Sequence, residues 1–195
     1  MGRAAAFLLL AALALPATAS AEWQFSPMIG ITFGGKTTLQ DFENATGNIH
    51  PTFGISGTYL TSGVFGVEGL AVLTPGFFQA GNDIVESSRT TAIMANVVIT
   101  VPRRWAEYSL RPFASGGIGL MRSTQEDNLG LLPVSSNVAG YNIGGGAVGY
   151  FSKTSGVRFD FRYYSNLHGV DQGAVAIGDV RLRYMTATVG FVIRR

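Results

Sequence analysis

A serine and a histidine near the end of the chain have the side chains needed for nucleophilic catalysis. Ser165 is followed by Asn166, and His168 stands three residues after the serine. A histidine within hydrogen-bond reach can take the proton of a serine hydroxyl, and the activated oxygen then attacks an ester. All three residues begin a polar stretch, so they also fit an ordinary strand end that leads into a turn.

Most of the acidic residues are spread over four predicted polar loops. Carboxylates bind divalent cations only when several oxygen ligands converge, and no loop here has the spacing of a calcium-binding loop, which favours solvated loops. His50 stands alone before Pro51, and a chain with two histidines and no cysteine is not expected to hold zinc. We therefore expect no metal and no cofactor. The loop acids are Asp41, Glu43, Asp83, Glu86, Glu126, Asp127, Asp171 and Asp179.

The segment 157–164 alternates between two kinds of side chain without a break. Its odd-numbered residues are Val157, Phe159, Phe161 and Tyr163, and its even-numbered residues are Arg158, Asp160, Arg162 and Tyr164. Successive side chains of a β-strand point to opposite faces, so the pattern predicts a strand with one apolar face and one charged face. Such a strand fits one edge of a soluble sandwich, or a barrel in lipid if the rest of the chain repeats the pattern.

Seven further segments repeat this alternation. They predict strands near residues 23–33, 52–59, 65–73, 90–101, 111–120, 141–151 and 184–193. Long polar loops are expected at 34–50, 75–88, 122–137 and 165–178, with short connections at 61–63, 102–107 and 152–155. About eight strands of roughly ten residues, joined by alternately long and short connections, are typical of barrels in the bacterial outer membrane.

The composition agrees with export and with a membrane barrel. Charged residues make up only 13% of the 195 residues, and a formal net charge of +2 gives no argument for nucleic-acid binding. Residues 1–21 read as a secretory signal peptide, with Arg3 before an apolar stretch and Ala19-Ser20-Ala21 as the cleavage site. We expect the mature domain to span residues 22–195, without disulfide bonds.

The direction of the apolar face separates two kinds of barrel. A soluble lipocalin-like carrier in the periplasm would turn Val157, Phe159 and Phe161 inward, whereas a membrane barrel turns them toward lipid. Small, polar and charged residues occupy the opposite faces of the predicted strands, which favours the membrane barrel. Buried charges must then be paired, so we expect a salt-bridge cluster that plugs the lumen. It would join Glu68 and Asp160 to Arg111, Arg158 and Arg162.

The chain resembles the small outer-membrane β-barrel proteins of the OmpA/OmpX type. The resemblance rests on the signal peptide, the strand count, the loop alternation, the glycine-rich strands after Arg111-Pro112-Phe113 and at 144–146, and the segment 157–164. It implies a closed antiparallel up-and-down transmembrane barrel, all-β, with outer-membrane lipid, lipopolysaccharide and the barrel insertion machinery as partners. Such barrels commonly end on an aromatic residue, and the last aromatic here is Phe191.

Beside the lipocalin-like carrier, two hypotheses of function are open for a membrane barrel. The first is a non-enzymatic envelope protein with a structural, adhesion or surface role, or with a narrow and mostly plugged passage. Arg103, Arg104 and Trp105 would then anchor a short turn at the membrane interface, although an ordinary polar turn explains them equally well. The second is an outer-membrane lipid A deacylase. Such enzymes carry a His-x-Ser-Asn motif, and here Tyr163 stands where that histidine belongs, before Ser165.

Overall fold

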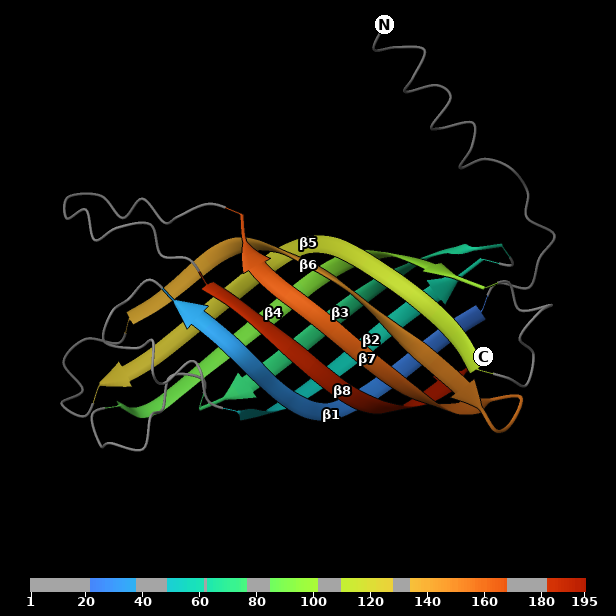
Figure 1. The fold of residues 1–195 in the computed structure, drawn as a ribbon, viewed down its shortest axis with the longest axis horizontal. Helices are drawn as coiled ribbons and strands as arrows, with labels where there is room; N and C mark the ends of the chain where they lie inside the picture. The colour runs from blue at the N-terminus through green and yellow to red at the C-terminus, as the bar shows by residue number, and fades with distance from the viewer. Residues whose placement is uncertain are drawn as a thin grey trace, which may run out of the picture.

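The chain folds into a closed barrel of eight strands in a computed structural model, which describes residues 22–37, 49–61, 63–76, 85–101, 110–127, 134–167 and 182–195. The strands follow one another around the barrel in chain order (Figure 1). They are β1 (Glu22–Thr37), β2 (His50–Leu60), β3 (Phe65–Pro75), β4 (Val85–Thr100), β5 (Leu110–Asp127), β6 (Val134–Tyr150), β7 (Ser155–Asn166) and β8 (Leu182–Arg194).

Every strand pairs with its neighbours in antiparallel fashion, and β1 pairs with β8 to close the barrel. The start of β1 and the end of β8 therefore lie at the same end of the barrel, which we call the terminal end. There the backbone of Trp23 exchanges two hydrogen bonds with Arg195, at 2.9 and 3.0 Å. Over the length that the eight strands share, the closure leaves no free strand edge and the backbone hydrogen-bonding groups are paired within the sheet.

The register of the strands sets their tilt. Following the paired residues from Trp23 through all eight strands leads back to β1 at Phe33, ten residues further along. Strands lie about 4.7 Å apart and rise about 3.3 Å per residue, so this offset corresponds to a tilt of roughly 40°. The tilted strands cross the long axis of the barrel in Figure 1. An eight-stranded barrel of this tilt is narrow enough for side chains to fill its interior.

The side chains are distributed inside out relative to a soluble barrel. Phe159 and Phe161 are 56% and 50% exposed on the outer surface, whereas Arg158 and Arg162 on the same strand are buried. The two kinds alternate because the residues of a strand point alternately into and out of the barrel. The outward position of the aromatic residues contradicts the lipocalin-like carrier.

Several strands are longer than their sequence pattern predicts. β5 extends to Asp127 and β6 begins at Val134, so most of the predicted loop 122–137 is sheet. Glu86, Glu126 and Asp127, which we expected in loops, lie on β4 and β5 for the same reason. These extensions carry polar residues on both faces, and the apolar alternation that marks a strand is therefore missing.

The longer strands also change the predicted alternation of connections. Residues 128–133 join β5 to β6 and residues 101–109 join β4 to β5, so the expected long connection is shorter than the expected short one. The connections at 61–64 and 151–154 are short, as predicted. In β1, a bulge between Phe33 and Lys36 includes Gly34, whose φ of 64° is left-handed and suits glycine.

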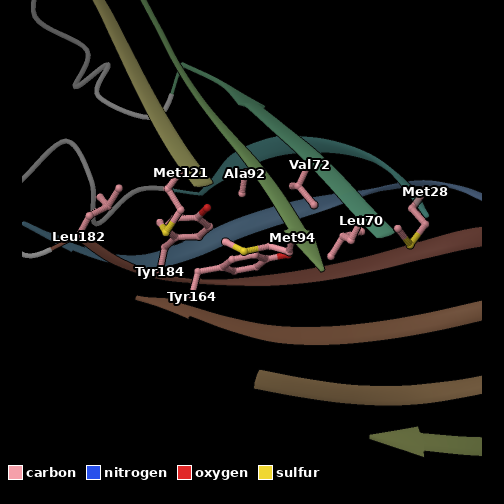
Figure 2. Packing of buried hydrophobic residues seen from close by; sticks show 9 residues of the cluster. All are labelled: Met28, Leu70, Val72, Ala92, Met94, Met121, Tyr164, Leu182 and Tyr184. Atoms are coloured by element: carbon pink, nitrogen blue, oxygen red, sulfur yellow. The ribbon is translucent and has the colours of Figure 1, made fainter. Parts of the chain in front are cut away.

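Two apolar layers cross the interior. The larger layer contains Tyr164 and Tyr184, whose rings stack with centroids 4.9 Å apart. Figure 2 shows Met94 beside Tyr164 and Met121 beside Tyr184 in this layer. A smaller layer nearer the terminal end contains Val148, Tyr150 and Val192, with Phe113 packed against them. Among the described residues, no helix is long and apolar enough to cross a membrane.

Candidate functional site in the lumen

Four ionised side chains meet in the middle of the barrel, between the two apolar layers. Arg158, Asp160 and Arg162 point inward from alternate positions of β7, and Glu68 points inward from β3. All four side chains are almost completely buried. We call these four residues the central cluster. The period-two pattern of β7 alone places three of them side by side.

The central cluster is balanced in charge and closely paired. Arg158 Nη2 lies 2.6 Å from Glu68 Oε2 and 2.6 Å from Asp160 Oδ2. Arg162 donates from Nη2 to Glu68 Oε1 at 2.6 Å and from Nε to Asp160 Oδ1 at 2.7 Å. Each guanidinium therefore bridges both carboxylates through short, charge-assisted hydrogen bonds.

Neutral side chains complete the hydrogen bonding of the central cluster. Asn96 donates to Glu68 Oε1 at 2.9 Å, and Asn142 in turn donates to Asn96 at 2.7 Å. Arg162 Nη1 donates to Asn142 Oδ1 at 3.3 Å, which closes a ring of contacts across the lumen. Arg158 Nη1 donates to Ser56 Oγ at 3.2 Å. The desolvation of the four charges is thus offset by ion pairs and by neutral partners together.

Glycines on β6 make room for the charged side chains of β7. A Cβ atom added to Gly144 would lie 2.7 Å from Cγ of Arg162, and one added to Gly146 would collide with the backbone of Phe159 and Asp160. Gly146 pairs directly with Asp160 in the register of the two strands. Gly144 and Gly146 therefore leave the space in which the side chains of β7 lie against the barrel wall.

A second polar group lies at the terminal end. Arg111 Nη1 lies 3.3 Å from Glu22 Oε2, and Arg194 Nη1 lies 3.8 Å from Glu22 Oε1. Tyr150 donates its hydroxyl to Glu22 Oε1 at 3.0 Å. We call Glu22, Arg111 and Arg194 the terminal cluster. The structure does not bring Arg111 to Glu68 and Asp160 as we expected, because Arg111 is the second residue of β5 and pairs with Glu22 at the terminal end.

Sequence reasoning missed both Glu22 and Arg194. The signal-peptide pattern predicts Glu22 as the first residue of the mature chain and gives it no place in the lumen. The signal was nevertheless present, because Glu22 and Gln24 extend the inward positions of β1 by the same period of two. Arg194 similarly continues the inward positions of β8.

Little open space remains between the two clusters. A cavity of about 10 Å³ is lined by residues of both clusters and of the smaller apolar layer, among them Arg111, Arg158, Phe113 and Val148. This volume is about what one water molecule needs. The lumen is therefore filled at this level by side chains rather than by an aqueous channel.

The catalytic candidate is not assembled in the described part of the structure. Ser165 is buried, and its hydroxyl donates to the backbone oxygen of Asn166 at 3.4 Å. Asn166 accepts a hydrogen bond from the backbone of Leu182 at 3.1 Å. Tyr163 lies on the outer face beside Tyr141, with ring centroids 6.4 Å apart. His168 lies outside the described residues, as do Arg103, Arg104 and Trp105 of the predicted interfacial anchor.

Exposed aromatic residues other than those of the predicted interfacial anchor surround the outside of the terminal end. Trp23 is 61% exposed and packs against Tyr59, with ring centroids 4.9 Å apart. Phe151 and Phe191 form a similar pair at 6.0 Å. Together with Phe65, these residues form the aromatic ring that membrane barrels carry at the level of the lipid headgroups. Among the described residues, no group of three or more His, Asp or Glu side chains could hold a metal ion.

Comparison with known proteins places the barrel in a family. The family model of the outer membrane protein beta-barrel domain matches residues 5–194. The chain belongs to this family. This membership and the inside-out surface together show an outer-membrane barrel. No curated protein sequence matches the chain.

Several solved outer-membrane barrels share the fold. Neisserial surface protein A has a TM-score of 0.64 at 12% identity, and the match covers 89% of this chain and 97% of that one. The Ail protein of Yersinia pestis has a TM-score of 0.53 at 13% identity, covering 89% and 99%. The N-terminal barrel of Pseudomonas aeruginosa OprF has a TM-score of 0.53 at 13% identity, covering 90% and 97%. These identities support a shared fold alone.

Proposed function

We propose that this outer-membrane barrel is a non-enzymatic surface protein, which displays a polar sheet outside the cell on a barrel whose lumen is closed. The terminal end faces the periplasm, as in bacterial barrels with an even number of strands. One observation carries the proposal: β4, β5 and β6 continue well past the apolar surface that faces the membrane.

The length of this projection follows from the strand tilt. At roughly 40°, each residue advances about 2.5 Å along the barrel axis, and each step to the next strand adds about 3 Å. Asp127 at the end of β5 then stands about 40 Å from the level of Trp23, whereas the apolar band of an outer-membrane barrel is about 25 Å tall. The paired ends of β4, β5 and β6 therefore rise clear of the bilayer.

The composition of the projecting strands suits contact with water-soluble partners. Residues 123–127 of β5 read Ser-Thr-Gln-Glu-Asp, and residues 135–137 of β6 read Ser-Ser-Asn. Residues 86–88 of β4 add Glu-Ser-Ser. We call the segments 85–88, 123–127 and 134–137 the outer ribbon. Its backbone is held by ladder pairing, so it presents hydrogen-bonding groups on a fixed frame.

The lumen argues against transport as the main role. The central cluster and the two apolar layers occupy successive levels of a narrow barrel. At the height of the larger apolar layer, Thr32, Thr52 and Thr74 form a group of mutually bonded hydroxyls at 2.5 to 3.1 Å. A solute would have to displace several packed layers in turn.

The names of the structural neighbours support a surface role. One neighbour is called a surface protein and another an attachment invasion locus protein. Ail has also been solved in complex with the heparin analogue sucrose octasulfate. A deacylase activity has weaker support, since Ser165 is buried and no described side chain is placed to activate it.

The test compares cells that display the wild-type barrel with cells that display a barrel without the β5 and β6 parts of the outer ribbon. The shortened variant joins residue 122 to residue 137, its register partner, by a two-residue turn. Retention of the gel-mobility difference between unheated and boiled samples serves as the control for folding. We expect the wild type to increase adhesion to host cells or matrix proteins and the shortened barrel to lose this gain. Equal adhesion by both barrels, or no gain from the wild type, would overturn the proposal.

The same cells allow a test of orientation. The chain has no cysteine, so a cysteine introduced at Thr124 or at Ser152 is the only one in this protein that a maleimide can label. On intact cells, a membrane-impermeant maleimide should label T124C and leave S152C unlabelled until the cells are broken. The reverse result would place the ribbon in the periplasm.

A further inference from the structure

Two arginines stand side by side on the outer surface, where β4 and β5 leave the membrane. Arg89 on β4 and Arg122 on β5 both point outward and are exposed. In the register of the two strands, Arg89 pairs with Thr124 and Arg122 pairs with Thr91. The two arginines are thus diagonal neighbours on the same face, which places their Cβ atoms about 7–8 Å apart.

Both arginines lie at the depth of the outer-leaflet headgroups. By the strand geometry above, Arg122 stands about 27 Å and Arg89 about 29 Å along the axis from the level of Trp23. Trp23 belongs to the aromatic ring at the terminal end and marks the opposite interface. A separation slightly larger than the apolar band of about 25 Å puts the guanidiniums just outside the hydrocarbon, at the level of lipid phosphates.

The surface below the two arginines is continuous and apolar. Ile93 on β4 is 60% exposed, and Ile118 and Leu120 on β5 are 64% and 62% exposed. Ile93 pairs directly with Leu120, two positions further into the membrane than the pair of Thr91 and Arg122. A lipid whose phosphate lies at the arginines would therefore rest its acyl chains on these three side chains.

The two guanidiniums are available for an anion. Within the described part of the chain, the salt bridges belong to the central and terminal clusters, and none involves Arg89 or Arg122. Guanidinium groups bind phosphate through paired hydrogen bonds, and Thr91 and Thr124 place two hydroxyl groups between them. The site thus combines two phosphate-binding cations with an apolar wall.

We propose that Arg89, Arg122 and the apolar surface below them bind one phosphate-bearing lipid of the outer leaflet, of the lipid A class. The proposal rests on the outer-membrane placement of the barrel and on the orientation proposed above, with the terminal end in the periplasm, and it is independent of adhesion by the outer ribbon. A lipid held between β4 and β5 would brace the wall of the barrel at the base of the outer ribbon.

Arg183 provides a matched comparison at the same depth. It points outward from β8, is exposed, and stands about 27 Å from the level of Trp23. Its register partners are Ser165 on β7 and Lys36 on β1, so no second arginine pairs with it. Without a second guanidinium, this position should bind phosphate less tightly than two adjacent arginines do.

The test is native mass spectrometry of the full folded chain in octylglucoside, titrated with bisphosphorylated lipid A. We expect the wild type to retain one lipid A and the R89Q/R122Q double variant to bind it at least tenfold more weakly. R183Q should weaken binding by less than about threefold. L120S should also weaken binding, which separates a lipid from a headgroup ion. All variants lie on the outer surface, and the gel-mobility difference on heating checks that each is folded.

Two further titrations identify the source of the phosphate. Lipid A without its phosphates should bind the wild type as weakly as the double variant binds intact lipid A. Inorganic phosphate at millimolar concentration should not displace the lipid, because it lacks acyl chains. The proposal is overturned if the double variant keeps wild-type affinity, if R183Q loses as much as the double variant, if phosphate-free lipid A binds equally well, or if inorganic phosphate displaces the lipid.

Discussion

The central and terminal clusters use the same residue types and differ in how tightly they are built. In the central cluster two carboxylates face two guanidiniums, with the closest ion pairs at 2.6–2.7 Å. In the terminal cluster one carboxylate faces two guanidiniums at 3.3 and 3.8 Å. Nη2 of Arg194 is buried without a hydrogen-bond partner, while its guanidinium lies over the Tyr150 ring.

The two clusters differ in tightness because their side chains come from different parts of the strands. One strand, β7, supplies three members of the central cluster at alternate positions, so their spacing is fixed by a single backbone. The terminal cluster draws its three members from the ends of β1, β5 and β8. Strand ends are less constrained than strand centres, and the geometry of the pairs is correspondingly looser. The central cluster therefore holds the barrel wall together, while the terminal cluster covers its mouth.

The substitution Glu68→Gln should have the largest effect on stability. It removes one of two carboxylates and leaves Arg158 and Arg162 sharing Asp160 in a buried site. Breaking a buried ion pair from one side costs about 3–5 kcal/mol. The urea midpoint for loss of the folded gel band should fall accordingly. Loss of less than about 1 kcal/mol would show that the central cluster is not the main constraint.

Gly146→Ala should come next, because its new methyl group collides with the backbone of β7 beside Asp160. Overpacking of this kind costs about 1–3 kcal/mol. Gly57→Ala is the matched control, since nothing lies within 4 Å of a Cβ atom at that position. Urea unfolding should separate the two variants clearly. Equal stabilities would mean that β6 does not need to approach β7 closely at the central cluster.

Glu22→Gln should cost less than Glu68→Gln although both remove a buried carboxylate. Its ion pairs are longer, and its guanidinium partners keep contacts to the backbone oxygens of Val101 and Lys153. We expect a loss of about 1 kcal/mol in the same urea assay. A loss equal to that of Glu68→Gln would erase the distinction between the two clusters.

Ser165→Ala should have the smallest effect, because Ser165 belongs to neither cluster and, among the described residues, its hydroxyl donates to the backbone oxygen of the next residue. The free energy of unfolding of this variant should stay within about 0.5 kcal/mol of the wild-type value. Mass spectrometry of lipid A from cells expressing wild type or variant should show the same acyl chains. Acylation that differs between the two strains would restore the deacylase hypothesis.

Period-two patterning was enough to predict the membrane-spanning part of the fold. The alternation of β7 identified both the lipid-facing aromatics and the charged side chains of the lumen, since pattern and orientation are linked within one strand. The eight strands and the outward apolar face were confirmed by the barrel and by its family. The signal peptide at residues 1–21 stays a prediction.

The sequence predictions failed where the structure depends on the register between strands, or where a strand lies in polar surroundings. Arg111 and Glu22 lie on different strands, and their contact depends on the offset between strands, which alternation within one strand does not contain. The sequence pattern predicts loops at the outer ribbon because its polar residues interrupt the apolar alternation that marks a strand. The layer around Tyr164 and Tyr184 was missed because apolar inward residues do not stand out in an apolar strand.

The central claim is that side chains close the lumen. It is tested most directly by the ionic conductance of the wild-type protein reconstituted at low density in a planar lipid bilayer. We expect no steady conductance above that of the protein-free bilayer, since the central cluster and both apolar layers lie across the path. A stable ohmic conductance from each inserted barrel would show a continuous aqueous channel and would contradict the account.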